Sequence, residues 1–249
     1  MKMINVPLVN GLGKTKGVEE AGNKVWKGDL EKIDFGEKDL IEINDLIYNK
    51  SFKEFGAGKV CFLGGDHSMS YPITRAFFDW CENESKKPCL IVFDAHPDLM
   101  EPVDRKIPTH EEWLRGLVED GFPVENILLV GVRNIDVVEK KYLQEKGIKR
   151  MSVEELMFNL ETKSDAIMEF GYGKEVYVSI DIDVVDPAYA PGTGYLEPGG
   201  ISSRELLYVL RRISKMKNLR AIDLVEINPS CDFNDMTSRL GEKIINIFY

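Results

Sequence analysis

Five short apolar runs, separated by longer amphipathic segments, are the feature of this 249-residue chain that most limits its fold. The runs are apolar at nearly every position rather than at alternate positions, which indicates strands buried on both faces. Buried strands that alternate with helices are typical of a parallel sheet between two helical layers. The runs are Val60–Leu63, Cys89–Phe93, Ile127–Val132, Val176–Ile182 and Ala221–Ile227.

Short capping signals predict where several of the intervening helices begin. A hydroxyl residue followed three positions later by Glu can satisfy free backbone N–H groups reciprocally, and this pattern starts at Thr109, Ser152 and Ser202. Before Lys59 the signals are weaker. There we expect one helix near Val18–Trp26 and another near Asp39–Phe52.

Composition limits the organisation and the partners of the chain. No linker or repeat divides it, so residues 1–249 are expected to form a single domain. The net charge of −10 disfavours nucleic-acid binding, which needs a basic surface. We find neither a membrane-spanning apolar run nor a signal-peptide pattern, and expect no membrane contact. The four cysteines lack disulfide or zinc-site spacing, which favours a reducing compartment and a soluble, cytoplasmic protein.

Side chains that can bind metals follow four of the apolar runs. In open α/β sheets, ligand sites gather outside the carboxyl ends of the strands, so these groups are expected to converge. Taken singly, a Gly-Gly-Asp or an Asp-Pro is typical of a turn. Asp94, His96 and Asp98 are more specific, because side chains two positions apart in an extended segment share one face. The candidate residues are His67, Asp94, His96, Asp98, Asp181, Asp183 and Glu226.

The first six of these residues predict a centre with two metal ions. Four clustered carboxylates would raise one another's pKa by repulsion and desolvation unless a counter-charge is present. Two divalent cations would neutralise them. Oxygen and nitrogen ligands without a thiolate suit Mn²⁺ better than structural zinc, and the number of ligands fits a two-metal site.

These residues stand in motifs that resemble, in the same order, those of the ureohydrolase (arginase/agmatinase) family. The resemblance runs from Lys59 to the C-terminus, with a fainter match at Gly17–Glu20. The matching segments are Gly64–Ser68 (GGDHS), Asp94–Asp98 (DAHPD), Gly131–Glu139, Ser179–Pro187 (SIDIDVVDP), Pro191–Gly194 and Val225–Pro229.

The resemblance implies a three-layer α/β/α fold around a mostly parallel sheet of about eight strands, as in arginases and deacetylases. It also implies two Mn²⁺ per chain and hydrolysis of a guanidino-type C–N bond by a metal-bridging hydroxide, releasing urea and an amine. A homo-oligomer, a trimer or a hexamer, is implied as well. By position, one ion would be bound by His67, Asp94, Asp98 and Asp183 together with shared groups, and the other by His96 and Asp181.

The resemblance further implies roles for three groups. Asp98 would orient the attacking hydroxide, and Glu226 would pair with the substrate cation. His110 lies 12 residues after Asp98, close to the place of the family's proton shuttle, and would protonate the leaving amine. The alternative for His110 is a surface residue in the first turn of a helix. Asp136 would recognise a substrate ammonium at the pocket rim, or it simply begins a helix.

Two departures from the family pattern concern the substrate. The stretch Leu99–Thr109 lacks the Asn and Ser with which arginases hold the amino-acid end of arginine, and Tyr195-Leu196 replaces the usual Thr-Pro. The following Glu197–Gly200 is more like agmatinases. An agmatine-like substrate is therefore favoured, and the alternatives in the family are arginine, a guanidino acid and formiminoglutamate.

Two interpretations from other classes remain to be compared with hydrolysis of a guanidino compound. The chain could be a non-catalytic metal-binding protein that retains this fold, although every expected ligand is present. It could also be a deacetylase-type hydrolase with one zinc ion, which the two metal-binding histidines disfavour. Metal content and turnover distinguish all three.

Overall fold

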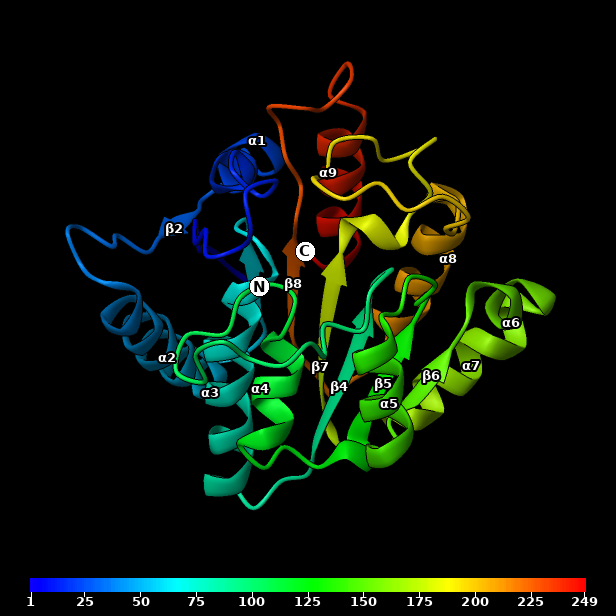
Figure 1. The fold of residues 1–249 in the computed structure, drawn as a ribbon, viewed down its shortest axis with the longest axis horizontal. Helices are drawn as coiled ribbons and strands as arrows, with labels where there is room; N and C mark the ends of the chain where they lie inside the picture. The colour runs from blue at the N-terminus through cyan, green and yellow to red at the C-terminus, as the bar shows by residue number, and fades with distance from the viewer.

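The computed structural model describes residues 1–249 and contains an eight-stranded sheet in which every neighbouring pair of strands is parallel (Figure 1). The strand order is β2-β1-β3-β8-β7-β4-β5-β6. The strands are β1 (Lys2–Asn5), β2 (Glu31–Lys32), β3 (Val60–Leu63), β4 (Pro88–Phe93), β5 (Ile127–Val130), β6 (Lys149–Met151), β7 (Glu175–Asp181) and β8 (Leu219–Val225).

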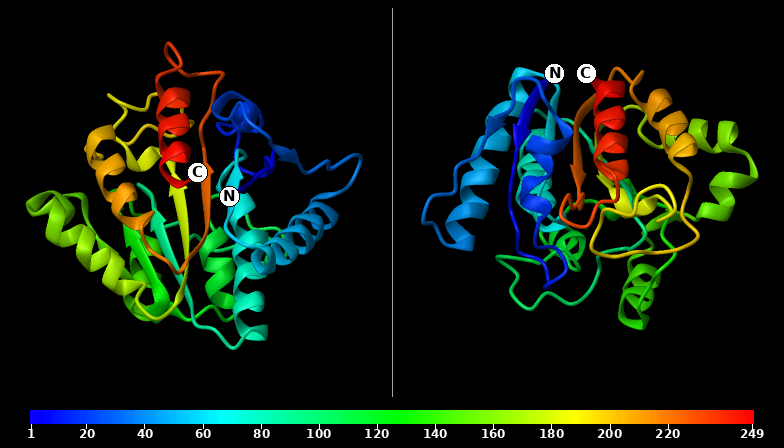
Figure 2. Two further views of the ribbon diagram at one scale, coloured as in Figure 1. Left: turned by 180° about the vertical axis from the view of Figure 1, so that it is seen from behind. Right: turned by 90° about the horizontal axis from the view of Figure 1, so that it is seen from above.

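Helices cover both faces of the sheet, and the view from above shows the three layers (Figure 2). Helices α2 to α5 pack on one face, and α1 and α6 to α9 pack on the other, each around its own apolar core. The helices are α1 (Ala21–Val25), α2 (Leu40–Ala57), α3 (Ser70–Asn83), α4 (Trp113–Glu119), α5 (Val137–Lys146), α6 (Val153–Phe158), α7 (Leu160–Phe170), α8 (Ser203–Ile213) and α9 (Met236–Phe248), with short 3₁₀ turns η1 (Val18–Glu20), η2 (His67–Met69), η3 (Val124–Asn126) and η4 (Ile182–Val184).

Burial on both faces explains why the strand sequences are apolar throughout. In β3, Val60 and Phe62 belong to the core under α2 and α3, whereas Cys61 and Leu63 belong to the opposite core. All four side chains are buried. Successive side chains of a strand point to opposite faces, so a strand between two helical layers must be apolar at every position. The expected three-layer fold with a parallel sheet is confirmed.

The predicted elements agree with the structure except in three strands and one helix start. The five apolar runs are β3, β4, β5, β7 and β8, and capping boxes are present at Ser152 and Ser202. The additional strands β1, β2 and β6 are short. The predicted capping box at Thr109 is wrong: the Glu112 side chain accepts from the Thr109 hydroxyl instead of a backbone N–H, and α4 begins at Trp113. None of the helices is both long and apolar enough to cross a membrane.

Candidate metal centre and its cavity

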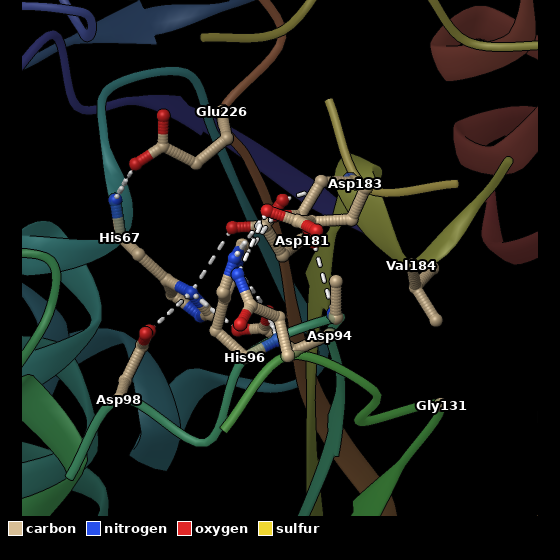
Figure 3. Close-up of polar contacts among 12 residues, drawn as sticks. His67, Asp94, His96, Asp98, Gly131, Asp181, Asp183, Val184 and Glu226 are labelled. Carbon is tan, nitrogen blue, oxygen red and sulfur yellow. Dashed lines mark hydrogen bonds and ion pairs between the residues drawn. The ribbon is translucent and has the colours of Figure 1, made fainter. Parts of the chain in front are cut away.

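The carboxyl ends of four adjacent strands, β3, β8, β7 and β4, bring the predicted site residues together (Figure 3). His67 opens the 3₁₀ turn after β3, and Asp94 directly follows β4. Asp181 ends β7, and Glu226 directly follows β8. Sequence neighbours β3 and β4 are separated by two other strands, so the chain crosses over at this edge and leaves room for a site.

His67 faces three carboxylates at hydrogen-bond distance. Its Nδ1 lies 3.0 Å from Asp94 Oδ2, 3.0 Å from Asp98 Oδ2 and 3.2 Å from Asp181 Oδ2. Nevertheless, His67 Nδ1 and Asp94 Oδ2 are both buried and have no hydrogen-bond partner. Nitrogen and oxygen atoms that converge without forming hydrogen bonds are arranged as ligands of a common cation, so the residues fit a divalent metal ion.

A second group of possible ligands shares Asp94 with the first. His96 Nδ1 lies 2.9 Å from Asp183 Oδ2 and 3.6 Å from Asp94 Oδ1. Asp94 therefore presents one oxygen to each group. The grouping differs from the expected assignment: Asp181 lies with His67, and Asp183 lies with His96. Asp181 ends β7 itself, whereas Asp183 lies in the following η4 turn, where its Oδ1 accepts from the Ala95 N–H next to His96.

The conformation of the second motif also differs from expectation. Asp94, His96 and Asp98 do not lie along one extended segment, because the backbone bends after β4 and Asp98 adopts a left-handed φ of 51°. The three side chains converge through these bends rather than through the alternation of a strand. Asp98 is held there by the indole of Trp113, whose Nε1 donates to Asp98 Oδ2 at 2.7 Å.

Electrostatics show that the cluster favours added positive charge. Burial and the charge of Asp94 raise the pKa of Asp98 to about 7, and burial together with Asp183 and Asp94 raises the pKa of Asp181 well above its usual range. Burial lowers the pKa of His67, but its contacts with Asp181, Asp94 and Asp98 outweigh burial and leave that pKa well raised. A centre that retains protons so strongly is one where bound cations stabilise the ionised carboxylates.

Two loops that meet at Gly131 hold the backbone of Asp183. Gly131 has a φ of 98°, and a Cβ there would lie 2.5 Å from Val184 Cγ2, so a side chain does not fit (Figure 3). The close approach lets the Arg133 guanidinium donate to the carbonyl oxygens of Asp183 (2.7 Å) and Val184 (3.2 Å). Arg133 thus positions the backbone of the η4 turn.

His110 and Glu226 form the opposite side of the site. His110 is 6% exposed, and its Nδ1 lies 3.3 Å from Glu226 Oε1, which also accepts from the His67 backbone N–H at 2.9 Å. Burial lowers the pKa of His110, but Glu226 outweighs this and raises it to about 9. The Leu12 N–H donates to His110 Nε2 at 3.3 Å. The surface position considered for His110 is therefore wrong.

Asp136 caps α5. Its Oδ1 accepts from the Val138 N–H at 2.8 Å, and Glu139 completes a capping box. The helix-start interpretation is therefore confirmed. Asp136 also lines the cavity beside the metal cluster, which leaves room for a second role.

The cluster opens into a cavity of about 440 Å³. Its charged wall consists of carboxylates and histidines, and Tyr195 lies against the imidazoles, with ring centroids 5.3 Å from His110 and 6.2 Å from His96. The sequence analysis assigned no role to several groups at the site. They are Trp113, Arg133, Asn134, Thr193 and Glu197, together with Glu111, and most of them lie in irregular loops.

Comparison with known proteins agrees with this geometry. The family model described as the Arginase family matches residues 14–248. The chain is 36% identical over 188 residues to a mitochondrial arginase 1 of Oryza sativa subsp. indica, covering 74% of this chain and 52% of that one. It is 34% identical over 186 residues to an agmatinase of Bacillus subtilis, covering 74% and 60%.

A solved structure shows the same fold. A formimidoylglutamase from Bacillus subtilis superposes with a TM-score of 0.86 at 22% identity, covering 99% of this chain and 85% of that one. The chain matches only about half the length of its plant relatives. Since the family match spans nearly the whole sequence, the chain belongs to the arginase family.

Proposed function

We propose that the protein is a two-metal hydrolase that cleaves a guanidino C–N bond and releases urea and an amine. The observation that carries the proposal is a set of buried, unpartnered ligand atoms: His67 Nδ1 and Glu226 Oε2 in residues that line the cavity, and Asp94 Oδ2, which faces His67 Nδ1. Leaving such atoms unsatisfied costs about 1–3 kcal/mol each, more when they are charged. A cation at His67 and Asp94 and a cationic substrate at Glu226 would offset this cost.

The metal ligands in this proposal are the two groups that share Asp94. The first consists of His67, Asp94, Asp98 and Asp181, and the second of His96, Asp94 and Asp183. Two divalent ions match the charge of the four carboxylates, and Mn²⁺ is the proposed metal because the donors are oxygen and imidazole nitrogen. Bound at this place, a pair of divalent ions makes water acidic enough to serve as the nucleophile.

The protein groups around the cluster then have distinct roles. Asp98 accepts a hydrogen bond from the attacking water and orients it toward the guanidinium carbon. Glu226 Oε2 pairs with the guanidinium, while Oε1 stays fixed by the His67 N–H. His110, whose Nδ1 faces Glu226, delivers a proton to the leaving amine. Burial of Glu226 (3% exposed) strengthens its interaction with a bound cation.

The cavity wall supports a substrate with a second positive charge. Besides the proposed metal ligands and Glu226, the cavity wall carries three further carboxylates, those of Glu111, Asp136 and Glu139. Carboxylates attract an ammonium and repel an α-carboxylate. A decarboxylated guanidino-amine such as agmatine is therefore proposed, with Asp136 near its ammonium.

A panel of four compounds tests the activity and the substrate separately. The Mn²⁺-loaded protein is incubated with agmatine, arginine, guanidinobutyrate and formiminoglutamate, and the release of urea or formamide is measured. We expect agmatine to give the highest kcat/KM. Faster turnover of arginine would contradict the substrate proposal alone. Tight binding of two metal ions without turnover of any compound would favour the non-catalytic alternative.

Metal analysis and point variants test the assigned roles. Active protein should contain about two Mn²⁺ per chain, as charge balance requires, and a single zinc ion would revive the deacetylase-type alternative. Asp183→Asn and His96→Ala should lower metal content.

The roles of Glu226 and His110 are tested by variants that should retain the metal. Glu226→Gln should raise the free-energy barrier measured by kcat/KM by about 3–5 kcal/mol, and His110→Ala should lower kcat by about 10²–10⁴-fold. Glu125→Gln, on the exposed η3 turn, is the matched control.

We also propose that the protein is a homo-oligomer. A groove between α8 and α9 is lined by Arg204, Arg211, Arg239 and Lys243 around Leu207, whereas the whole chain carries a net charge of −10. An acidic second copy complements a basic groove of this kind. Light scattering should give a mass above 28.3 kDa, and Arg211→Glu with Lys243→Glu should reduce it. A monomer at micromolar concentration would refute this.

A cytoplasmic location is proposed from the state of the cysteines. All four are free thiols, and Cys61, Cys81 and Cys89 are buried in the cores. Free thiols persist in reducing compartments. Fractionation of the native cells would test this, and recovery in an oxidising compartment would contradict it.

A further inference from the structure

A buried carboxylate outside the ligand cluster, that of Asp223, has four hydrogen-bond donors. Asp223 lies in β8 and is fully buried. Its Oδ2 accepts from the hydroxyls of Ser70 (2.8 Å) and Tyr177 (2.7 Å), and its Oδ1 accepts from the Ser179 hydroxyl (2.7 Å) and the Ile180 N–H (3.3 Å). A buried charge is tolerated when it is satisfied in this way. None of the roles proposed above uses it.

Ser179 connects this carboxylate to the first metal group. Strands β7 and β8 pair Ser179 with Asp223, and Ser179 Oγ lies 2.9 Å from His67 Nε2. A serine hydroxyl has one proton to donate, and an ionised carboxylate can only accept. The Ser179 proton therefore lies toward Asp223, and the Ser179 oxygen accepts a hydrogen bond from His67 Nε2–H.

This direction of hydrogen bonding fixes the tautomer of His67. With a proton held on Nε2, the ring binds a metal through Nδ1, the atom that faces Asp94, Asp98 and Asp181. Any proton on Nδ1 leaves when the metal enters. A proton placed on Nδ1 instead, with Nε2 free, would have to move to Nε2 before the ring could bind a metal through Nδ1, which weakens ligation.

We propose that Asp223 is a positioning residue for metal binding: acting through Ser179, its carboxylate holds His67 in the Nε2–H form that a ligand requires. The inference rests on the proposed function only in that the cluster binds metal ions. It needs no assumption about the substrate. It predicts that the metal affinity depends on the charge of a residue that contacts no metal ligand directly.

Asp223→Asn removes the negative charge at the start of the chain of hydrogen bonds with little change in volume. The Ile180 N–H can only donate, so the amide oxygen stays at the Oδ1 position and the NH₂ group faces the hydroxyls of Ser70 and Tyr177, which can accept. The neutral amide oxygen holds the Ser179 proton less strongly than a carboxylate does, so Ser179 is freer to donate to His67 Nε2, which places the remaining ring proton on Nδ1. Mn²⁺ affinity, titrated through the electron paramagnetic resonance signal of the free ion, should fall by about 10–100-fold.

Tyr177→Phe is the matched control. It removes a donor from the same carboxylate, on the Oδ2 side, and leaves Ser179 and His67 untouched. A structural role of the carboxylate predicts that both variants lose metal affinity in proportion to their loss of stability. The positioning role predicts that Tyr177→Phe lowers the melting temperature and keeps Mn²⁺ affinity within about threefold of the unmodified protein.

A second variant keeps the inference falsifiable if Asp223→Asn does not fold. Ser179→Ala breaks the same connection and should also weaken Mn²⁺ binding by about 10–100-fold. If both single variants fold, the double variant Asp223→Asn/Ser179→Ala should bind Mn²⁺ no more weakly than Ser179→Ala. The reason is that the effects of substitutions within one chain of hydrogen bonds do not add. Additive losses, or an Asp223→Asn protein that binds Mn²⁺ like Tyr177→Phe, would overturn the proposal.

The tautomer can be observed directly, since the chain has only three histidines. In ¹⁵N imidazole spectra of protein loaded with diamagnetic Zn²⁺, His67 should show a protonated Nε2. Protonated Nδ1 in the unmodified protein would refute the inference. If the unmodified protein binds neither Mn²⁺ nor Zn²⁺, the proposed function fails instead, so the two failures are distinguishable.

Discussion

Gly131→Ala is the perturbation whose cost can be worked out most directly from the structure. Two separate penalties are expected at this position. The backbone φ of 98° is unfavourable for any residue with a Cβ, at about 1–2 kcal/mol. In addition, the Cβ would lie 2.5 Å from Val184 Cγ2, and overpacking of a buried site costs about 1–3 kcal/mol. The free energy of unfolding should therefore fall by about 2–5 kcal/mol.

The two penalties can be separated by matched variants. Gly121 has a φ of 102°, and no atom lies within 4 Å of its would-be Cβ. Gly121→Ala therefore carries the backbone penalty alone, about 1–2 kcal/mol. Val184→Ala removes the methyl group that the new Cβ strikes and by itself costs about 2 kcal/mol. The double variant Gly131→Ala/Val184→Ala should be more stable than the sum of its parts by about 1–3 kcal/mol.

The assay is urea unfolding followed by both fluorescence and circular dichroism, with coincident curves as the check for two-state behaviour. Equal costs for Gly131→Ala and Gly121→Ala would refute the argument from close contact. So would additivity within about 0.5 kcal/mol in the double variant. Because Arg133 donates to the carbonyl oxygen of Asp183 from the same loop, Gly131→Ala should also lower Mn²⁺ affinity.

Three further outcomes follow from other parts of the molecule. Trp113→Phe removes the N–H donated to Asp98 and should lower Mn²⁺ affinity by about 10–100-fold in a titration, whereas Trp80→Phe, on the buried face of α3, should leave it unchanged. Asp39→Ala removes the capping box of α2 and should cost about 1 kcal/mol in urea unfolding. In metal-free protein, ionisation of buried Asp98, with its pKa raised to about 7, opposes folding, so the melting temperature should fall as pH rises from about 4 to 7, and excess Mn²⁺ should abolish that fall.

The fold could be predicted from the sequence where an element is buried on both sides. The run Val60–Leu63 matches β3 residue for residue, because each of its side chains enters one core or the other. The strand β6 was missed because it lies at the edge of the sheet and buries only Met151. The strand β2 has two exposed residues and no apolar signal. Short edge strands are specified by their partners, which a local pattern does not contain.

The sequence predicts which residues form the candidate metal centre, but not which of them lie together in each of the two ligand groups. His67, Asp94 and Asp181 each stand at the end of an apolar run, and a parallel sheet brings such ends to one edge. The identity of the nearest neighbour depends on the turn after β7, which places Asp181 beside His67 and Asp183 beside His96. Asp223 carried a local signal that went unused: a charge in the middle of a buried strand requires partners, and here they lead to His67.

Two of the site carboxylates also occupy unfavourable backbone conformations. Asp98 and Glu226 have φ values of 51° and 62°, and a non-glycine residue in that region costs about 1–3 kcal/mol. The surroundings fix both. The Asp98 carbonyl oxygen accepts from the Arg115 N–H, and the Glu226 N–H donates to the carbonyl oxygen of Gly65. Both side chains reach the place where the ligands meet: Asp98 Oδ2 lies 3.0 Å from His67 Nδ1, and Glu226 Oε1 accepts from the His67 N–H. The unfavourable backbone conformations and the repulsion between carboxylates therefore occur at the same edge of the sheet. Because bound cations would offset that repulsion, metal binding should stabilise this edge more than any other part of the molecule.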